Sequence, residues 1–264
     1  MSAPSPAFER TKEALISAAA PLLLLALWEW AGRNGSAPSY LSFPSAISAA
    51  FMELARKGEY FSSTWISLLR AYFGFAIGAT LGVCLGLLAA TQRHVREFFD
   101  PIVSFLYPVP KIAFLPVLLL TFGIGDGSKV ALIALSVFFP LFMSARQSLA
   151  AVDRNIVWAA RNMGASQTTI FRRVLLPAIR PQLFAGARIG LALAFIVLFA
   201  AEIIGSRDGL GHLISEAENN VQFDAMLAGI AGFMVLGFVN DRALLALRSW
   251  MLRGQLLDTE EGSS

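Results

Sequence analysis

The chain has 264 residues, of which 56% are hydrophobic and only 15% are charged. Soluble domains carry about 25% charged residues, so this composition excludes an ordinary soluble protein and indicates a membrane protein. The net charge is +3, and the basic residues gather in loops beside apolar runs. This arrangement follows the positive-inside rule and argues against a nucleic-acid-binding surface. Cys84 stands alone in an apolar run, so we expect it to pack as a small apolar residue.

The first membrane span is predicted near the N-terminus. Residues 1–14 are the expected cytoplasmic N-terminal segment, and the apolar run Leu15–Ala31 follows them. This run could cross a bilayer only marginally, because it is shorter than the roughly 20 residues that are typical of a span. A cleaved signal peptide is the alternative, because basic residues precede the run. Trp28 and Trp30 favour an uncleaved span, since tryptophan gathers at the membrane–water interface.

The second span is predicted over Ala71–Gln92, after an external segment (residues 32–63) that holds an amphipathic helix ending at Lys57. Small residues recur every four positions along this span and share one face: Gly74, Gly78, Gly82 and Gly86. Such spacing lets two helix backbones approach closely in lipid. We therefore expect this face to be buried against protein, and packing within the subunit is favoured over contact in a dimer.

A broken third span is predicted next. A short charged loop, Arg93–Asp100, is expected on the inside, followed by a span over Pro101–Thr121. Three prolines in this span predict a broken or kinked helix, which is tolerated where the freed carbonyls face protein or water. Lys111 lies among its apolar residues. We favour a lysine that extends to the inner interface, and the alternative is a position along an anion pathway.

The fourth span, Val130–Ser144, leads into a segment (residues 151–181) that reads as a helical hairpin. Asp153 is a good N-cap for a first helix, and Gly164 suits a left-handed helix stop. Ser166 is placed to cap a second short helix that runs to Leu176. Prolines follow at positions 177 and 181, and they discourage its continuation.

This hairpin is strongly basic, and Asp153 is its only acidic residue. The basic residues in and beside it are Arg146, Arg154, Arg161, Arg172, Arg173 and Arg180. A basic loop between spans should stay on the cytoplasmic side. A rigid hairpin with an exposed apolar edge suits docking into a groove of a partner protein. An interfacial helix lying on anionic lipid is the main alternative, and a DNA-reading helix-turn-helix is disfavoured by the flanking spans.

The last two spans are predicted over Ile189–Ser206 and Ala225–Asn240, with the final helix continuing to Arg253. Glu202 lies within the fifth span, where a carboxylate costs several kcal/mol unless it has a partner. A structural hydrogen bond between span and loop is favoured, and a gate or pathway residue is the alternative. The acidic loop that follows is expected outside. The chain is thus predicted to be all-α and polytopic, with six transmembrane helices within residues 15–253, a cytoplasmic tail (residues 254–264) and both termini inside.

Two stretches of the sequence resemble a known family. Ala159-Ala160, then Gly164, then Leu176-Pro177 resemble the "EAA" loop of the membrane subunits of ATP-binding-cassette importers. The run Ala200–Gly211 is similar to the nitrate, sulfonate and taurine branch of these subunits. The usual glutamate of the loop is replaced by Trp158, so a partner contact at this position would need an apolar surface.

The resemblance implies a type I importer permease in the bacterial inner membrane, with no cofactor of its own. An ATPase subunit dimer would dock on the coupling loop, through Asp153, Trp158, Ala159, Ala160, Gly164, Ala165, Ser166, Phe171, Leu176 and Pro177. A second permease copy, most simply as a homodimer, and an external solute-binding protein would complete the importer for a small oxyanion such as sulfonate, taurine or nitrate.

Catalytic and metal-binding patterns are missing from the sequence. His94 and His212 have no companions at metal-ligand spacing, and no phosphate-binding loop for ATP is present, so the chain is expected not to be an enzyme. The alternative function is a stand-alone secondary carrier or channel. Such a protein would need paired ionisable groups near mid-membrane and repeat symmetry.

Overall fold

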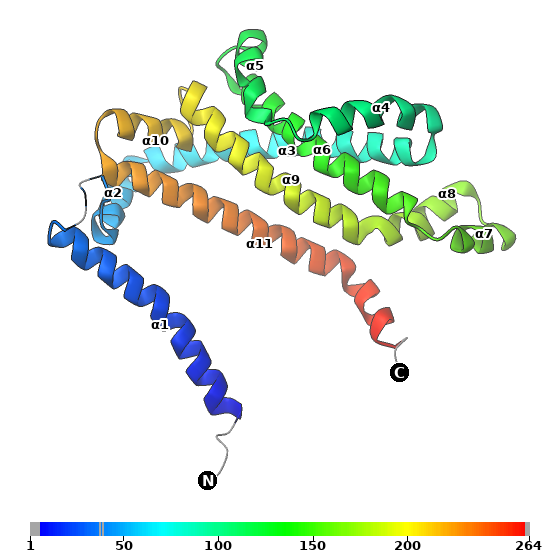
Figure 1. Cartoon of the computed structure of the whole chain (residues 1–264), viewed down its shortest axis with the longest axis horizontal. Coiled ribbons are helices and arrows are strands. Elements are labelled where there is room, and N and C mark those ends of the chain that lie inside the picture. The colour runs from blue at the N-terminus through cyan, green and yellow to red at the C-terminus, as the bar shows by residue number, and fades with distance from the viewer. Residues whose placement is uncertain (1–5, 37, 39, 262–264) are drawn as a thin grey trace. The chain divides into compact units, whose positions relative to one another are not determined.

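The computed structural model describes residues 6–36, 38 and 40–261, and this part of the chain is helical without β-strands (Figure 1). In chain order the helical elements are α1 (Pro6–Arg33), α2 (Pro44–Lys57), α3 (Glu59–Thr91), α4 (Arg93–Leu106), the 3₁₀ turn η1 (Lys111–Phe114), α5 (Leu115–Phe122), α6 (Asp126–Ala150), α7 (Arg154–Asn162), α8 (Gln167–Ile170), the π-helical segment η2 (Phe171–Leu175), α9 (Leu176–Gly205), α10 (Leu210–Asn219) and α11 (Phe223–Glu261).

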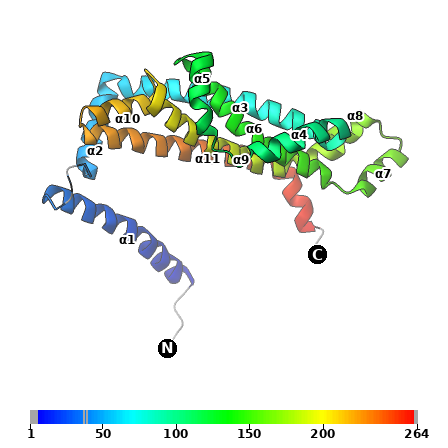
Figure 2. The same cartoon turned by 45° about the horizontal axis from the view of Figure 1, so that its top comes forward.

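The chain forms two compact units. The smaller unit contains residues 1–62 and 213–231, and the larger unit contains residues 63–212 and 232–264. The larger unit holds most of α3, all of α4 to α9 and the second part of α11 (Figure 2). The candidate coupling loop, the broken span and Glu202 all lie in this larger unit.

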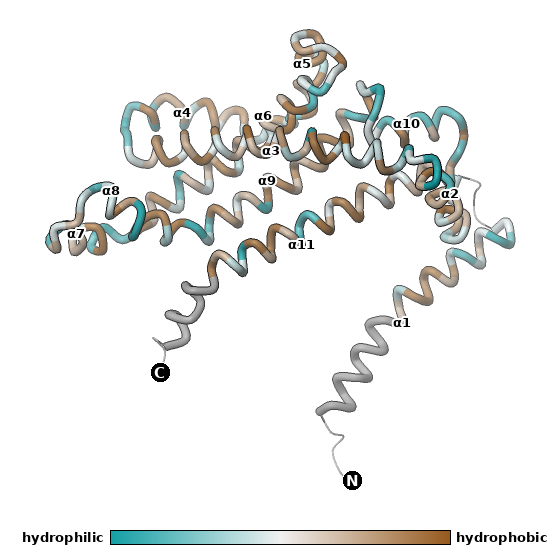
Figure 3. The backbone as a smooth tube through the Cα atoms, turned by 180° about the vertical axis from the view of Figure 1, so that it is seen from behind, coloured by the Kyte–Doolittle hydropathy of each residue, from teal (hydrophilic) through white to brown (hydrophobic). Residues whose placement is uncertain are grey.

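The predicted membrane character is confirmed by the helices. Within the described residues, four segments are long and apolar enough to cross a membrane: Glu59–Thr91, Asp126–Ala150, Gln167–Gly205 and Phe223–Leu252. A fifth is added if α4 and the segment Lys111–Phe122, which are bent by 98° at their junction, count as one broken span. The predicted first span falls in α1, where the side chains before residue 19 are outside the described part of the chain. Figure 3 shows the hydrophobic residues distributed along these helices.

Helix α6 forms the core of the larger unit. Its most apolar window is 67% buried, compared with 28–39% for the other three spans. Side chains of α6 such as Leu132 pack with Leu115 from α5 and with Val197 and Ala201 from α9. Phe142, further along α6, packs against Val103 of α4 and Ala89 of α3. A helix that is surrounded in this way is apolar on most of its faces, as the sequence of Val130–Ser144 is.

The four glycines of α3 lie directly against α6 of the same subunit. A Cβ atom added at Gly74 would lie 2.6 Å from the Cβ of Ile133, and one at Gly82 would lie 2.6 Å from the carbonyl oxygen of Phe138. Gly86 leaves similar space for the backbone of Phe142, and Gly78 for that of Ala134. Two backbones approach this closely only where side chains are absent.

We predict that Gly82→Val destabilises the larger unit. The new side chain has no space against the backbone of α6, and overpacking of this kind costs about 1–3 kcal/mol. Thermal unfolding of the detergent-solubilised protein measures the effect. The matched control is Leu81→Val, because the neighbouring Leu81 is 50% exposed and points away from this contact. Equal melting temperatures for the two variants would contradict a close α3–α6 contact.

The prediction of a short loop over Arg93–Asp100 is wrong, because these residues begin the regular helix α4. Charged residues occupy one face of this helix, where Arg93 Nε donates to Glu97 Oε1 at 2.6 Å. Val95 and Phe99 lie on the other face and pack against the buried residues around Phe142. The charged residues thus form the polar side of an amphipathic helix. That its other side is buried follows only from packing against other helices.

Candidate functional site

The first half of the candidate coupling loop (residues 151–181) folds as local chemistry dictates. The side chain of Asp153 accepts a hydrogen bond from the backbone N–H of Asn155 at 2.8 Å and caps α7. At the other end, Gly164 adopts φ +81°, and its N–H donates to the carbonyl of Arg161 at 2.9 Å. The N–H of Ala165 donates to the carbonyl of Ala160 at 3.1 Å. This pair of bonds is a Schellman motif, which closes the helix and turns the chain sharply.

The second half of the loop differs from the expected short helix. The hydroxyl of Ser166 accepts from the N–H of Thr169 at 3.2 Å and caps α8. Helical structure does not stop at Leu176, because it continues from α8 through the π-helical segment η2 into α9 without a break. Pro177 lies in the first turn of α9, directly after the π-helical segment, where the regular α-helical hydrogen-bond pattern is already interrupted. Pro181 lies further inside α9 and does not interrupt it.

The hairpin presents apolar side chains to solvent. Trp158 is 59% exposed and Met163 is 81% exposed, and Ile156 and Phe171 are also exposed. Ala160 and Ile170 point inward and are buried. Figure 1 places α7 and α8 together, at the end of the larger unit near the junction of α6 and α9. The residues predicted for coupling thus lie on one hairpin, with Trp158 on its exposed surface.

Lys111 lies at the break between α4 and α5. Its ammonium donates to the carbonyl oxygens of Leu106, Tyr107 and Val109 at 2.7–2.9 Å. These carbonyls lie at and just beyond the end of α4, where the α-helical hydrogen bonds stop, and that of Leu106 also accepts from the N–H of Val109 at 3.1 Å. The ammonium also lies 4.5 Å from the centre of the Phe139 ring. The predicted break is therefore present, and the lysine caps its first half.

Glu202 of α9 is fully buried and is bound by residues of two other helices, α3 and α10. Its carboxylate accepts from Ser67 Oγ at 2.8 Å, from Arg70 Nη1 at 2.8 Å and from the N–H of Gly211 at 2.9 Å. Ser67 in turn accepts from the N–H of Leu210 at 2.9 Å. These contacts fit the favoured interpretation of a hydrogen bond between span and loop, and they connect α3, α9 and the start of α10.

Arg70 is the centre of this cluster, and the sequence reasoning missed it. Its side chain is 4% exposed and pairs with Asp126, with Glu202 and with Asp208. Ser206 accepts a further hydrogen bond from Nη1 at 3.1 Å. The available signal was the position of Arg70 directly before the uncharged run Ala71–Gln92. From the sequence alone, an arginine at this position is interpreted as a residue of the membrane interface, because its carboxylate partners lie far away along the chain.

Two glycines make room for the buried carboxylate. A Cβ at Gly209, whose φ is +97°, would lie 2.6 Å from the carboxyl carbon of Glu202, and a Cβ at Gly211 would lie 2.5 Å from its Cβ. Asp208, between span and helix, feels opposing effects: burial raises its pKa, but hydrogen bonds and charge from Arg70 outweigh burial and hold the pKa below its usual value. The last two glycines of the run Ala200–Gly211 therefore have a structural reason: they leave space for the side chain of Glu202.

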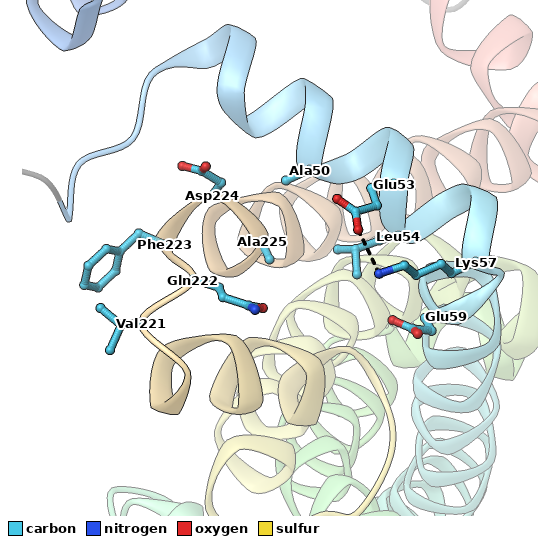
Figure 4. A pocket seen from close by; sticks show the side chains of 10 residues that line it. All are labelled: Ala50, Glu53, Leu54, Lys57, Glu59, Val221, Gln222, Phe223, Asp224 and Ala225. Atoms are coloured by element: carbon cyan, nitrogen blue, oxygen red, sulfur yellow. Dashed lines mark ion pairs between the residues drawn. The ribbon is translucent and has the colours of Figure 1, made fainter.

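The smaller unit contains a separate cavity of about 490 Å³ between α2 and the start of α11 (Figure 4). Lys57 and Glu53 form an ion pair of 2.8 Å on its wall, and the hydrogen bond from Lys57 lowers the pKa of Glu53. Glu59 and Asp224 also line it. The described residues nevertheless contain no group of three or more side chains suited to holding a metal ion.

Taken together, the helices define a polytopic membrane component with a helical hairpin, α7–α8, between two of its spans. The chain belongs to the family of binding-protein-dependent transport system inner membrane components, whose model matches residues 82–253. It is therefore the permease subunit of an ATP-binding-cassette importer, a multi-pass inner-membrane protein without catalytic activity of its own. The family implies an ATPase and a solute-binding protein as partners.

The relatives agree with this membership. The chain is 33% identical to the aliphatic sulfonates transport permease protein SsuC of Bacillus subtilis, over 88% of this chain and 85% of that protein. It is 32% identical to the taurine transport system permease protein TauC of Escherichia coli, over 86% and 84% of the two chains. A chain of the inward-facing MetNI methionine transporter shares the fold, with a TM-score of 0.55 and 21% identity over 76% of this chain and 95% of that one.

Proposed function

We propose that this permease imports a small organic oxyanion, and an aliphatic sulfonate in particular. The observation that carries the proposal is the similarity along most of the chain to permeases named for sulfonates and taurine. The fold supports it by providing a bundle of apolar spans in which a solute path can form between two permease copies. We further propose that the partner copy is identical, and that both termini and the hairpin α7–α8 face the cytoplasm.

The hairpin α7–α8 is proposed to be the surface that the ATPase dimer grips. Its exposed apolar residues, Trp158 and Met163 above all, suit a groove in a partner protein. Helical structure continues from Gln167 to Gly205 over 39 residues. At about 1.5 Å per residue, this helical segment is close to 60 Å long. It therefore reaches from the hairpin to Glu202, near the far end of α9, and can act as a lever. ATP-driven closure of the ATPase pair would then move this lever as a rigid body.

Reconstitution tests the proposed function. The permease is placed in proteoliposomes with its ATPase and its binding protein, and uptake of radiolabelled taurine and short alkanesulfonates is followed. We expect uptake that needs ATP and all three components. Active uptake by the permease alone, or stimulated ATP hydrolysis without uptake of any sulfonate, would overturn the proposal.

Trp158 offers a test of the docking surface. We predict that Trp158→Glu weakens association with the ATPase, because a charged side chain would replace the apolar one on an interface matched to tryptophan. Co-purification of the ATPase with the permease measures the effect. Arg154→Glu, on the same hairpin and also exposed, controls for the added negative charge. Unchanged association of the Trp158 variant would show that the partner accepts a carboxylate at this position.

A further inference from the structure

The broken span forms a pocket in the larger unit. A cavity of about 420 Å³ lies beside the break between α4 and α5, against α6 and α9. Its lining includes Tyr107 and Lys111 at the break, Phe139 of α6, and Ile196 of α9. Discontinuous transmembrane helices are the usual place for solute sites in membrane carriers, because the break exposes polar groups at membrane depth.

The charge of Lys111 is not neutralised within the described part of the chain. Its ammonium donates to three carbonyl oxygens and lies over the ring of Phe139, and it forms none of the ion pairs found among the described residues. Carbonyl dipoles and an aromatic face solvate a cation without removing its charge. A lysine inside a membrane protein without a counter-ion is costly, so an anion that enters this pocket is favoured.

The remaining lining determines what kind of anion fits. Apart from Lys111 it consists of apolar side chains, Tyr107 and Ser136, and the hydroxyl of Ser136 already donates to the carbonyl of Leu132 at 2.8 Å. Among the described lining residues there is no carboxylate. A ligand with a positive group, such as taurine, would bury its ammonium without a partner, which is unfavourable. An inorganic oxyanion would leave the apolar walls without contacts.

We propose that this pocket is a binding site for an unsubstituted aliphatic sulfonate, with the sulfonate group near Lys111 and the alkyl chain against Ile196 and Phe139. This inference rests on the proposed function, and it makes the permease itself contribute to substrate choice. Alkyl length then matters, because each methylene group that is fully buried is worth roughly a factor of four in affinity. The permease is expected to favour butanesulfonate over methanesulfonate, and both over taurine.

The experiment fills part of the pocket with a larger side chain in the complete importer. Lys111 is not changed, because it also caps α4 and its loss could disturb the fold. We use Ile196→Trp instead, because this substitution removes no hydrogen bond. Ile189→Trp is the control: it lies two turns earlier on the same helix, is similarly exposed (54% against 63%), and is outside the lining. Uptake of methane-, ethane- and butanesulfonate is compared in proteoliposomes with the same ATPase and binding protein.

We expect Ile196→Trp to lower butanesulfonate uptake by roughly tenfold relative to methanesulfonate uptake, because the longer chain loses its apolar contacts. Ile189→Trp should keep the wild-type profile of chain length. If Ile196→Trp and Ile189→Trp show the same dependence of uptake on chain length, the pocket does not bind the sulfonate and the assignment is overturned. The same result is expected if a lipid chain fills the pocket. If the wild-type importer transports no sulfonate, the proposed function itself fails, so the two failures are distinguishable.

Discussion

Arg70→Met is expected to lower the free energy of unfolding by about 3–5 kcal/mol, the range found when one partner of a buried ion pair is removed. The substitution leaves the fully buried Glu202 without its guanidinium partner, and it leaves Asp208 and Asp126 close to that uncompensated charge. Arg70→Lys should rescue little of this loss, because a single ammonium cannot replace the fork that reaches three carboxylates.

The measurement is the melting temperature of the purified permease in detergent, together with its yield from the membrane. Arg188→Met is the control, because Arg188 forms a two-bond pair with Asp241 but its side chain is 52% exposed. Exposed pairs contribute little, so only a small shift is expected there. Adding Glu202→Gln to Arg70→Met should recover part of the loss. Equal shifts for Arg70→Met and Arg188→Met would contradict a buried ion cluster.

Gly164→Val is expected to abolish most ATP-driven uptake while the permease still inserts into the membrane. Gly164 holds φ at +81°, and a β-branched residue is strained there by roughly 1–2 kcal/mol or more. Relief of this strain would open the Schellman motif and change the angle between α7 and α8. In the coupling that we propose, a hairpin with the wrong angle could no longer transmit movement of the ATPase into α9.

Uptake and ATP hydrolysis, measured together in proteoliposomes, test this expectation. We expect Gly164→Asn to retain most of the activity, since asparagine tolerates the left-handed region. Gly123→Val also imposes backbone strain, in the turn before α6 at φ +76°, and it separates damage to the hairpin from backbone strain in general. Normal ATP-driven uptake by the Gly164→Val variant would count against the hairpin as the coupling element.

The capping residues of the hairpin show how far local sequence rules extend. Asp153, Ser166 and Gly164 were predicted from their residue types and spacing, and each makes the local bond or adopts the backbone angle expected of it. Each of these features depends on groups within about five residues along the chain. The stripe of glycines on α3 likewise follows from a spacing of four, although its partner helix could not be named.

The continuity from α8 into α9 shows where such rules end. Pro177 was expected to help stop the second helix, but a π-helical segment places it in the first turn of α9. Likewise, the charges of Arg93 and Glu97 predicted a loop, but a buried apolar face turns them into the outer side of α4. In both cases packing against other helices outweighed a local preference.

The amino-acid sequence by itself determined the class of protein, the apolar spans, the broken third span and the capped hairpin, because each is written in composition or in spacings of a few residues. Tertiary structure alone decided the partner of Glu202, because Arg70 is 132 positions away and no short pattern joins the two. It also decided that Lys111 lies beside an apolar pocket. Buried charges find their counterparts across helices, so only the folded chain identifies them.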